Sequence, residues 1–546
     1  KNENKEKKYK TRKKWTEIIK NNKKRILLSG WLKVSTHKSI YDAIHDFFIS
    51  KEFNMVVLNG NVADIELEDI LCEDFPKIIS SLTQIIYDTP LIRYFGLKFN
   101  DIPEVILQDG IIAAKEEYNC SEVTARAIAN LIYIYFSDAI EYYNPDLMIC
   151  ICTTGLAGKI IKRICQHKQI PLCDMEWGVL PGTITFDYKG HMAESWIAEY
   201  SDFFNNLPLL DIDMNVARNY LNIANNKELS RNVSVPITKN IVEQINILRQ
   251  QGKKVILYME SNSAGSGNTL ADITIAKKHS PIYFSDVDAY EQLEKICIKH
   301  EDWHILYKPH PISITRGIKT KINKKNTTIL YEGGLSESLE LADISITLLS
   351  QSAYISLIKE KPVVLLGRLQ LNGTGSAYEL KKKEELEDTI KKALYYGYSD
   401  KQKKAFLEHV ARVLKYYVYS ANPIVKIIDA KVMAINLYKI INGNQEDFYL
   451  FERKAYLEQI ETKTKIYSSN APMVSVIIPV YNTDNYVSST LDSICKQSYT
   501  NIEILCVNNG STDDSQVILE YYANRDNRIK ILNSNIPNLA QARNIG

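Results

Sequence analysis

The chain has 546 residues and a formal net charge of +2 at pH 7, with 24% charged and 45% hydrophobic residues. This length exceeds what one hydrophobic core supports, so several domains of ordinary globular composition are expected. Residues 1–25 carry twelve Lys or Arg against three Glu, which leaves the remaining residues net negative. Because the residues after position 25 are net negative, the folded domains are not expected to carry a broad basic surface. This argues against a nucleic-acid-binding protein.

The basic arm, residues 1–24, has two interpretations. Lysines and arginines near an anionic membrane surface each contribute about 1 kcal/mol of binding. A run of like charges is more commonly a solvated helix or linker, which we favour. Nine cysteines without disulfide-type spacing indicate a reducing compartment, and Cys150 and Cys152 are expected to be buried thiols. We expect a cytoplasmic protein, with contact to the inner face of the cell membrane as the alternative.

Short apolar runs that end in Gly or an acid alternate with long amphipathic stretches in residues 25–235. Such alternation predicts parallel strands with crossover helices, which is a doubly wound α/β sheet. The longest expected helix is SEVTARAIANLIYIYFSDAIEYY. The expected strands lie in RILLSG, NMVVLNG, EVILQDG, PDLMICICTTG and IPLCDMEWG.

The pattern restarts in residues 236–385, where five further apolar runs predict a second doubly wound sheet. These runs are KKVILYMES, DWHILYKPHP, TTILYEGG, ADISITLLS and KPVVLLG. Residues 386–460 are strand-poor and are expected to be helical and to pack back on these domains. Residues 461–472 are a polar linker, and a third, partial sheet is expected in residues 473–546. Two successive Rossmann-like domains followed by long helices match the outline of the GT-B fold.

A candidate phosphate site lies in HILYKPHP, where Lys308 and His310 follow a strand and Pro311 stiffens the loop. Lys308 can act as a point charge, and His310 as a hydrogen-bond donor. Farther along the chain, Ser350 and Ser352 come between the strand in ADISITLLS and a helix, where hydroxyl and N–H groups bind anions. Alternatively, the His is ordinary turn surface and the serines are simple helix caps.

A glycine- and serine-rich loop, SNSAGSGN, follows the strand KKVILYME and begins at Ser261. Such a loop lets backbone approach a phosphate or an acceptor, and Ser261 and Gly265 are its candidate residues. The loop lacks the lysine of a P-loop, so it can equally be a surface turn.

The order of MESNSAGSG, HSPIYFSDVDAY, YKPHP and ADISITLLSQSAYISLIKEKPVVLLG resembles the capsule polysaccharide synthesis family, which includes bacterial β-Kdo transferases. Residues 170–195 resemble that family's segment with E-x-G, LPGT-like and D-x-x-G motifs. The resemblance covers about residues 25–385. It implies that His310, Ser350 and Ser352 bind the phosphate of a nucleotide sugar, with Lys308 in the same segment. CMP-sugars are the favoured donors, UDP-sugars the alternative, and no metal or other cofactor is expected in this module.

Sugar transfer also needs a carboxylate as base or nucleophile. We rank Glu176 of MEWG first, Asp187 of TFDYKG second and Asp109 of LQDG third, with His310 as the remaining catalytic candidate. Asp109 resembles the acid-acid-Gly motif of sialyltransferases, although Gln108 replaces the first acid. The alternative for each carboxylate is a turn or cap role.

Residues 473–546, beginning MVSVIIPVYN, resemble the nucleotide-binding half of a family-2 GT-A glycosyltransferase. The resemblance implies donor contacts by Pro479, Tyr481, Asn482, Asn509, Asp513, Arg543 and Asn544. Asn508-Asn509 stands where the family usually has an acidic pair, which puts the base contact in doubt. A complete GT-A domain needs Mg²⁺ or Mn²⁺. We expect this part alone to be inactive and the chain to be a piece of a longer protein.

These patterns together predict a glycosyltransferase that moves a sugar, Kdo-like in the favoured case, from a nucleotide donor to a growing surface polysaccharide or glycolipid. Two alternatives stay open for the GT-B module. It can be a UDP- or GDP-sugar transferase or a glycerol-phosphate-type polymerase. It can also be a non-catalytic scaffold that presents the acceptor to the C-terminal transferase.

Overall fold

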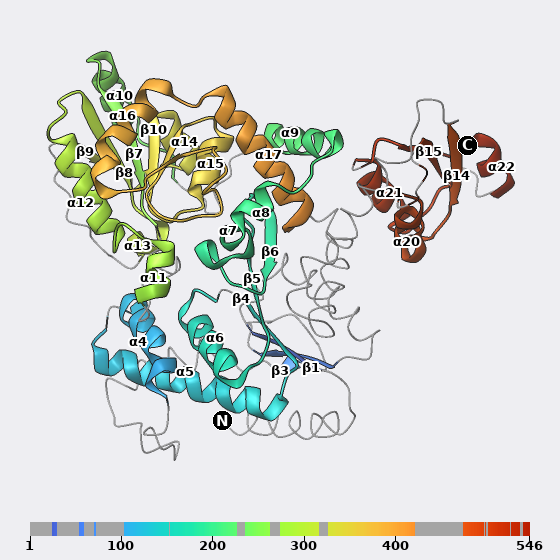
Figure 1. Cartoon of the computed structure of the whole chain (residues 1–546), viewed down its shortest axis with the longest axis horizontal. Helices are drawn as coiled ribbons and strands as arrows, with labels where there is room; N and C mark the ends of the chain where they lie inside the picture. Colours follow the sequence, from blue (N-terminus) through green and yellow to red (C-terminus); the bar gives the residue numbers. More distant parts are fainter. Residues whose placement is uncertain are drawn as a thin grey trace. The chain divides into compact units, whose positions relative to one another are not determined.

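The structure is a computed structural model of the whole chain (Figure 1). It describes residues 25–29, 54–58, 70–71, 103–118, 120–151, 153–225, 235–261, 273–315, 326–420, 473–495, 497, 499, 501–524, 526–534 and 539–546. The basic arm 1–24, the linker 461–472 and Gly265 lie outside the described residues. The predicted α/β class is confirmed, because the described strands form three sheets with mostly parallel pairing.

The first sheet has seven strands in the order β13-β6-β5-β4-β1-β2-β3. Their bounds are β1 Arg25–Ser29, β2 Asn54–Leu58, β3 Ile70–Leu71, β4 Leu147–Ile151, β5 Leu172–Trp177, β6 Thr183–Asp187 and β13 Val418–Ser420. Strands β1 to β5 pair in parallel. Strand β6 is antiparallel to β5 and places Asp187 opposite Asp174. Two buried carboxylates therefore come from neighbouring strands.

Three helices pack on one another beside this sheet, and their buried faces form its main core. They are α4 Glu104–Tyr118, α5 Glu122–Tyr143 and α6 Leu156–Lys168. Shorter elements follow: η3 Met192–Glu194, α7 Trp196–Glu199, α8 Ser201–Asn205 and α9 Asp211–Asn225. The predicted long helix 121–143 is confirmed, with Ser121 as its N-cap. Its side chain accepts the N–H of Thr124, as a capping serine does.

The prediction of a strand at EVILQDG is wrong, because these residues begin helix α4. A short apolar run does not distinguish a buried strand from one face of a helix. Here Ile106, Leu107, Gly110 and Ile111 recur at helical spacing on the buried face. Asp109 therefore lies inside a helix and not at the end of a strand.

The second sheet has six strands in the order β12-β11-β10-β7-β8-β9, all paired in parallel. Their bounds are β7 Lys254–Met259, β8 Trp303–Lys308, β9 Thr327–Ile329, β10 Ile344–Thr347, β11 Val363–Leu365 and β12 Tyr378–Glu379. Tyr258, Tyr290 and Tyr307 pack ring against ring in its core, with Tyr258 and Tyr307 stacked at 5.7 Å. The five strands expected from the sequence are confirmed.

The helices of this region are α10 Lys239–Gln250, α11 Ile273–His279, α12 Asp286–Cys297, α13 Pro311–Thr315, α14 Leu335–Glu340, α15 Ser352–Ile358, η5 Lys383–Glu385, α16 Leu386–Tyr396 and α17 Asp400–Tyr416. Helices α11 to α15 connect successive strands of this sheet, as a doubly wound fold requires, and the other helices of the region precede or follow the strands. Helix α17 contacts the regions of both the first and the second sheet. His409 hydrogen-bonds to Tyr354 of α15 at 2.9 Å, and Arg412 Nε donates to the carbonyl of Leu207, after α8, at 2.9 Å.

The third sheet has the strands β14 Val474–Val480, β15 Ile502–Asn508 and β16 Ile529–Asn533. The strands are parallel and are joined by helices α20 Asp484–Cys495 and α21 Ser515–Ala523, with α22 Leu539–Ile545 last. Its core holds Val480, Leu491, Ile504, Cys506 and Leu519. Across the described parts of the chain, no helix combines the length and apolarity needed to cross a bilayer.

Candidate functional site

The carboxyl ends of β7, β8, β9 and β10 meet at one edge of the second sheet. Parallel strands place their following loops together at such an edge, where ligands bind in doubly wound folds. The loops there carry Ser261, Lys308, His310, Ser350 and Ser352, all predicted from the sequence. The structure therefore brings these candidates to the same edge.

Lys308 is engaged within the protein. Its ammonium donates to the backbone carbonyls of Glu332 at 2.9 Å and Gly333 at 2.8 Å. Burial lowers the pKa of this ammonium. The bonds fix the loop after β9 against the end of β8, and they use two of the three donor hydrogens of Lys308. Its contact with a phosphate stays a prediction.

Glu260, which directly follows β7, holds the loop that carries His310. One carboxylate oxygen accepts the backbone N–H of His310 at 2.7 Å, and the other accepts the hydroxyl of Ser313 at 3.1 Å. Pro311 begins helix α13 directly after His310. Burial raises the pKa of Glu260. Sequence reasoning missed Glu260, although an acid directly after a buried strand was the available signal.

Ser350 and Ser352 hydrogen-bond to each other in the turn before α15. The Ser350 hydroxyl lies 2.9 Å from the Ser352 hydroxyl and accepts the backbone N–H of Ser352 at 3.2 Å. The N–H of Ser350 is bound by Thr347 Oγ1 at 3.2 Å. Both serines are half-buried. This pattern is that of a local turn cap, which leaves hydroxyl acceptor capacity for a ligand.

Ser261 joins three segments of the edge. Its hydroxyl accepts the N–H of Leu349 at 2.8 Å, and its own N–H donates to Asp286 Oδ1 at 3.1 Å. Tyr258 donates to the same Asp286 oxygen at 3.0 Å. Burial raises the pKa of Asp286 to about 7. Asp286, which the sequence did not single out, therefore fixes the start of the loop after β7.

Asp187, at the end of β6, is a connecting carboxylate. Its oxygens accept the N–H of Lys189 and of Trp196 at 2.8 Å each, and the hydroxyl of Tyr417 at 2.9 Å. A longer contact of 3.4 Å comes from the N–H of Gly190. Burial raises the pKa of Asp187 to about 6. These four donors come from the turn after β6, the start of α7 and the end of α17. Asp187 therefore acts as a structural anchor, a buried carboxylate that holds separate segments of the chain together.

Glu176 is half-buried near the end of β5, and its carboxylate accepts the N–H of Trp177 at 2.9 Å. Two residues earlier, Asp174 is buried and accepts the Thr153 hydroxyl at 2.5 Å. Burial raises the pKa of Asp174 to about 6, against the opposing effect of nearby His191. Of the ranked carboxylates, Glu176 is the one that keeps partial access to solvent.

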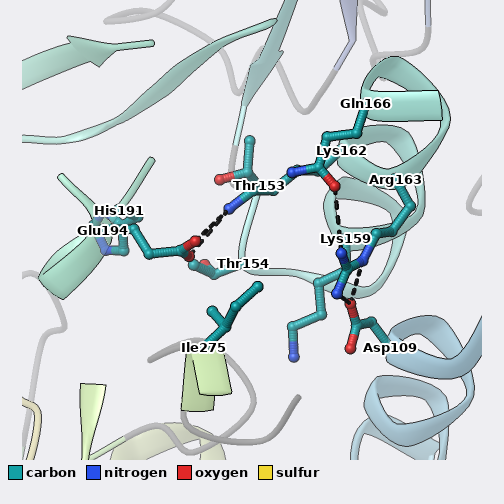
Figure 2. Close-up of a pocket in the computed structure, with 10 residues that line it drawn as sticks. All are labelled: Asp109, Thr153, Thr154, Lys159, Lys162, Arg163, Gln166, His191, Glu194 and Ile275. Atoms are coloured by element: carbon teal, nitrogen blue, oxygen red, sulfur yellow. Dashed lines mark hydrogen bonds and ion pairs between the residues drawn. The ribbon is translucent and has the colours of Figure 1, made fainter. Parts of the chain in front are cut away.

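Asp109 lies in a charged pocket beside α6 (Figure 2). Arg163 holds its carboxylate at 2.6 Å, and the Asp109 side chain is 4% exposed. Across the pocket, Lys162 lies 3.0 Å from Glu194. Burial would raise the pKa of Glu194, but His279 and Lys162 bring it down to about 2. Both acids of the pocket are thus paired with cations.

The loops of the third sheet are linked by short hydrogen bonds. The side-chain oxygen of Asn482 accepts the backbone N–H of Thr512 at 2.8 Å, and the backbone N–H of Asn482 donates to Ser511 Oγ at 3.1 Å. Asp513 accepts the N–H of Asp484 at 3.0 Å. Asn482 has a φ of 49°, the left-handed conformation that Asn tolerates in turns. The ends of β14 and β15 therefore form one ordered surface.

The remaining C-terminal candidates divide by exposure. Pro479 is half-buried, whereas Tyr481, Arg543 and Asn544 are exposed. Asn509 is 2% exposed, and its side-chain oxygen has no hydrogen-bond partner among the described residues. The donor roles of these residues stay predictions. In the described parts of the chain, no group of three or more His, Cys, Asp and Glu is arranged to hold a metal ion.

Comparison with known proteins identifies the C-terminal segment. Residues 475–546 match the model of glycosyl transferase family 2. The Streptococcus pneumoniae glycosyltransferase GlyG is 43% identical over 75 residues, which are 14% of this chain and 25% of that protein. Glycosyltransferase GlyA of the same species is 47% identical over 73 residues, or 13% of this chain and 10% of that protein. The chain spans a quarter or less of the length of these relatives.

Solved structures similar to the chain include two KpsC enzymes of Thermosulfurimonas dismutans. The beta Kdo 2,4 transferase is 16% identical with a TM-score of 0.37, covering 53% of this chain and 87% of that chain. The beta Kdo 2,7 transferase is 14% identical with a TM-score of 0.36, covering 76% and 100%. TM-scores of 0.36 and 0.37 are too low to indicate the activity of this chain. The sequence match is decisive for one segment: residues 475–546 belong to glycosyltransferase family 2.

Proposed function

We propose that the chain is part of a bacterial glycosyltransferase that transfers a sugar from a nucleotide donor to a growing surface polysaccharide or glycolipid. The observation that carries this proposal is the family-2 match of residues 475–546. The preceding GT-B-like module would supply a second transfer activity. Its favoured donor is a CMP-activated, Kdo-like sugar, with a UDP-sugar as the alternative.

In this proposal the donor phosphate lies at the carboxyl edge of the second sheet. Glu260 holds the backbone of His310 at 2.7 Å, so the imidazole can be presented without a large ordering cost. The imidazole would donate a hydrogen bond to the leaving phosphate, and the hydroxyls of Ser350 and Ser352 would add polar contacts. Fixed donors of this kind stabilise charge that develops on the phosphate oxygens.

Glu176 is the proposed base or nucleophile. A catalytic carboxylate must reach the substrate, and Glu176 is half-buried whereas Asp187 is 2% exposed and bound by four donors. Asp187 is assigned to positioning, and Asp109 to the charged pocket beside α6. No cofactor is proposed for this module. A complete GT-A domain would add carboxylates that hold Mg²⁺ or Mn²⁺ at the diphosphate.

The place of action follows from the substrates. Nucleotide sugars are made inside the cell, so we propose a cytoplasmic location. Contact with the inner face of the membrane is the alternative for the basic arm, residues 1–24, since anionic lipids attract Lys and Arg.

A scaffold role is the competing function, and two observations favour it. Lys308 already binds two carbonyls, and the two serine hydroxyls bind each other. A module with these groups satisfied internally could present acceptor glycan without binding a nucleotide. The proposal and the scaffold role therefore differ in whether this edge of the second sheet takes a nucleotide.

The test is thermal denaturation of the full chain with CMP, UDP, GDP or ADP, repeated with His310→Ala and Arg543→Ala. A ligand raises the melting temperature only by binding the native state. We expect CMP to stabilise the chain, His310→Ala to abolish that effect and Arg543→Ala to leave it intact. If no nucleotide acts through His310 in any of the samples, the donor site at this sheet edge is wrong and the scaffold role stands.

A further inference from the structure

The short helices α7 and α8 carry a cluster of aromatic rings around Trp196. The ring centroids of Tyr200 and Phe203 each lie 6.1 Å from that of Trp196, the first ring tilted and the second edge to face. Trp196 is buried, whereas Tyr200 is 43% and Phe203 is 40% exposed. Single exposed aromatic residues are ordinary, but exposed rings that share one buried ring form a contiguous apolar patch, and such patches mark binding sites.

A lysine completes this cluster. The ammonium of Lys189 lies 5.5 Å from the ring centroid of Tyr200 and 5.5 Å from that of Tyr188, within the range of cation–π attraction. Lys189 is half-buried in the turn that follows β6. The cluster therefore joins the turn after β6 to the two short helices.

The protein holds the cluster from its buried side. The carboxylate of Asp187 accepts the backbone N–H groups of both Lys189 and Trp196 at 2.8 Å. The buried ring of Phe204 packs edge to face on Trp196 at 5.9 Å and on Tyr417 at 6.5 Å. The exposed rings are therefore carried by fixed backbone, so that a ligand can bind them with little ordering of the chain.

The cluster lies next to the loop that follows β11 at the proposed donor edge. Arg368 of that loop donates to the carbonyl of Ala198 in α7 at 3.1 Å. The same loop begins against β10, because a Cβ on Gly367 would lie 2.6 Å from the carbonyl oxygen of Leu348. The donor candidate Ser350 follows two residues after Leu348. A ligand on the exposed rings would therefore lie close to a donor bound at this edge.

The exposed acids beside the rings indicate the kind of ligand. Glu199 directly precedes Tyr200, Asp202 directly precedes Phe203, and both acids are exposed. Carboxylates accept strong hydrogen bonds from hydroxyl groups, and they are repelled by an anionic lipid surface. A pyranose ring meets both features of the patch, because its C–H groups form an apolar face and its hydroxyls surround that face.

We propose that Tyr200 and Phe203 form a stacking platform for a neutral hexose unit of a glycan chain. The two rings contact the C–H face of the sugar, and Glu199 and Asp202 accept its hydroxyls. Lys189 donates to a hydroxyl or ring oxygen from the side of β6. That this glycan is the acceptor of sugar transfer rests on the proposed function. Its binding to the platform does not, because a scaffold that presents the acceptor needs the same contact.

The experiment is saturation-transfer-difference NMR of the full chain with cellotriose, maltotriose, triacetylchitotriose and sorbitol. Sorbitol carries the hydroxyls of a hexose but has no ring, so it lacks the flat C–H face. We expect magnetisation transfer to the ring C–H protons of at least one trisaccharide and none to sorbitol. The affinity of the chain for that trisaccharide is then measured by calorimetric titration.

The variants separate stacking from general effects on the fold. Phe203→Ala and Tyr200→Ala should each weaken trisaccharide binding about tenfold, because a stacked ring is lost. Tyr200→Phe keeps the ring and should bind like the parent. Tyr395→Ala is the matched control, since Tyr395 is an exposed tyrosine of α16, outside the cluster. Asp202→Asn leaves both rings in place and should weaken binding severalfold, so it keeps the test valid if the ring variants do not fold.

The proposal is overturned if no trisaccharide receives magnetisation, if sorbitol receives as much, or if Tyr395→Ala weakens binding as much as the platform variants. Vesicles of phosphatidylglycerol test the other occupant of an exposed aromatic patch. If Phe203→Ala lowers vesicle binding and no trisaccharide binds, the patch is a membrane contact and the glycan platform is wrong.

Nucleotide binding is followed in the same samples by thermal denaturation with CMP. Trisaccharide binding without any nucleotide response supports the platform and rejects the proposed sugar transfer by this module. A nucleotide response that depends on His310, without trisaccharide binding, rejects the platform alone.

Discussion

The first and second sheets use carboxylates differently at their edges. In the second sheet, Glu260 and Asp286 hold the loops that carry the donor candidates. In the first sheet, Asp187 gathers donors from three parts of the chain, the last of them Tyr417, 230 positions away. One edge therefore orders loops for a ligand, whereas the other ties distant segments of the fold together.

This difference shows why a buried acid is an ambiguous functional signal. Burial raises the pKa of Asp174, Asp187 and Asp286, and perturbed pKa values are typical of active sites. The hydrogen-bond partners separate the two roles. An acid whose oxygens are filled by backbone N–H groups is an anchor, and one such as Glu176 with partial exposure can meet a substrate.

The largest expected effect is at the anchor of the first sheet. Asp187→Ala leaves the buried N–H of Trp196 and the hydroxyl of Tyr417 without an acceptor, and each such group costs about 1–3 kcal/mol. We expect a loss of about 4 kcal/mol in the free energy of unfolding, measured by urea denaturation. Asp202→Ala, at an exposed position of α8, should stay within about 0.5 kcal/mol of the parent. Equal stability of the two variants would contradict the anchor role.

The second expected effect is a pH dependence of the free energy of unfolding, caused by Asp286 at the edge of the second sheet. Asp286 has an ordinary pKa of 3.8 and a folded-state pKa of about 7, because burial disfavours its charge. The folded chain therefore holds this proton more tightly, so its contribution to stability is full below about pH 4 and is lost as pH rises to about 7. Asp286→Asn should flatten that decline.

The measurement is the free energy of unfolding between pH 4 and pH 8 for the parent and Asp286→Asn. As pH rises from 4 to 8, the parent should lose stability relative to Asp286→Asn, by a few kcal/mol at most, because only the parent must ionise a buried carboxyl group. Asp302→Asn, at an exposed site, serves as the matched control. Parallel curves for all three proteins would show that Asp286 is ionised throughout and that its environment is misassigned.

Much of the fold could be predicted from the sequence, because each buried parallel strand is a short apolar run with its own boundary signals. The strands around Lys308 and Ser350 were found in this way, and so the loops that follow them were placed at one sheet edge. Asp109 was misplaced, since the run EVILQDG fits a strand as well as one face of a helix. Local pattern alone does not resolve that choice.

The contacts of the site could not be predicted, because they join residues far apart in the chain. Nothing near Asp187 indicates Tyr417, and nothing near Lys308 indicates the carbonyls of the loop after β9. Likewise nothing near Arg163 in the sequence indicates its ion pair with Asp109, which lies 54 positions away. The sequence indicates which polar side chains stand at the ends of strands. Only the packed structure shows which of these side chains already have hydrogen-bond partners within the protein.

The smallest expected effect on stability is at Glu260, and it tests whether the two sheet edges differ. Glu260→Ala removes the acceptor for the N–H of His310 and the hydroxyl of Ser313, both half-buried. Because water can replace part of these bonds, we expect a loss of only about 2 kcal/mol in stability. Nucleotide affinity should fall about tenfold, since the His310 loop must then be ordered on binding. Glu260→Gln keeps one acceptor and should lie between the two, and Glu301→Ala, at an exposed position, should change neither quantity. If Glu260→Ala lowers stability but not nucleotide affinity, Glu260 is an anchor like Asp187, and the two sheet edges are built on the same plan.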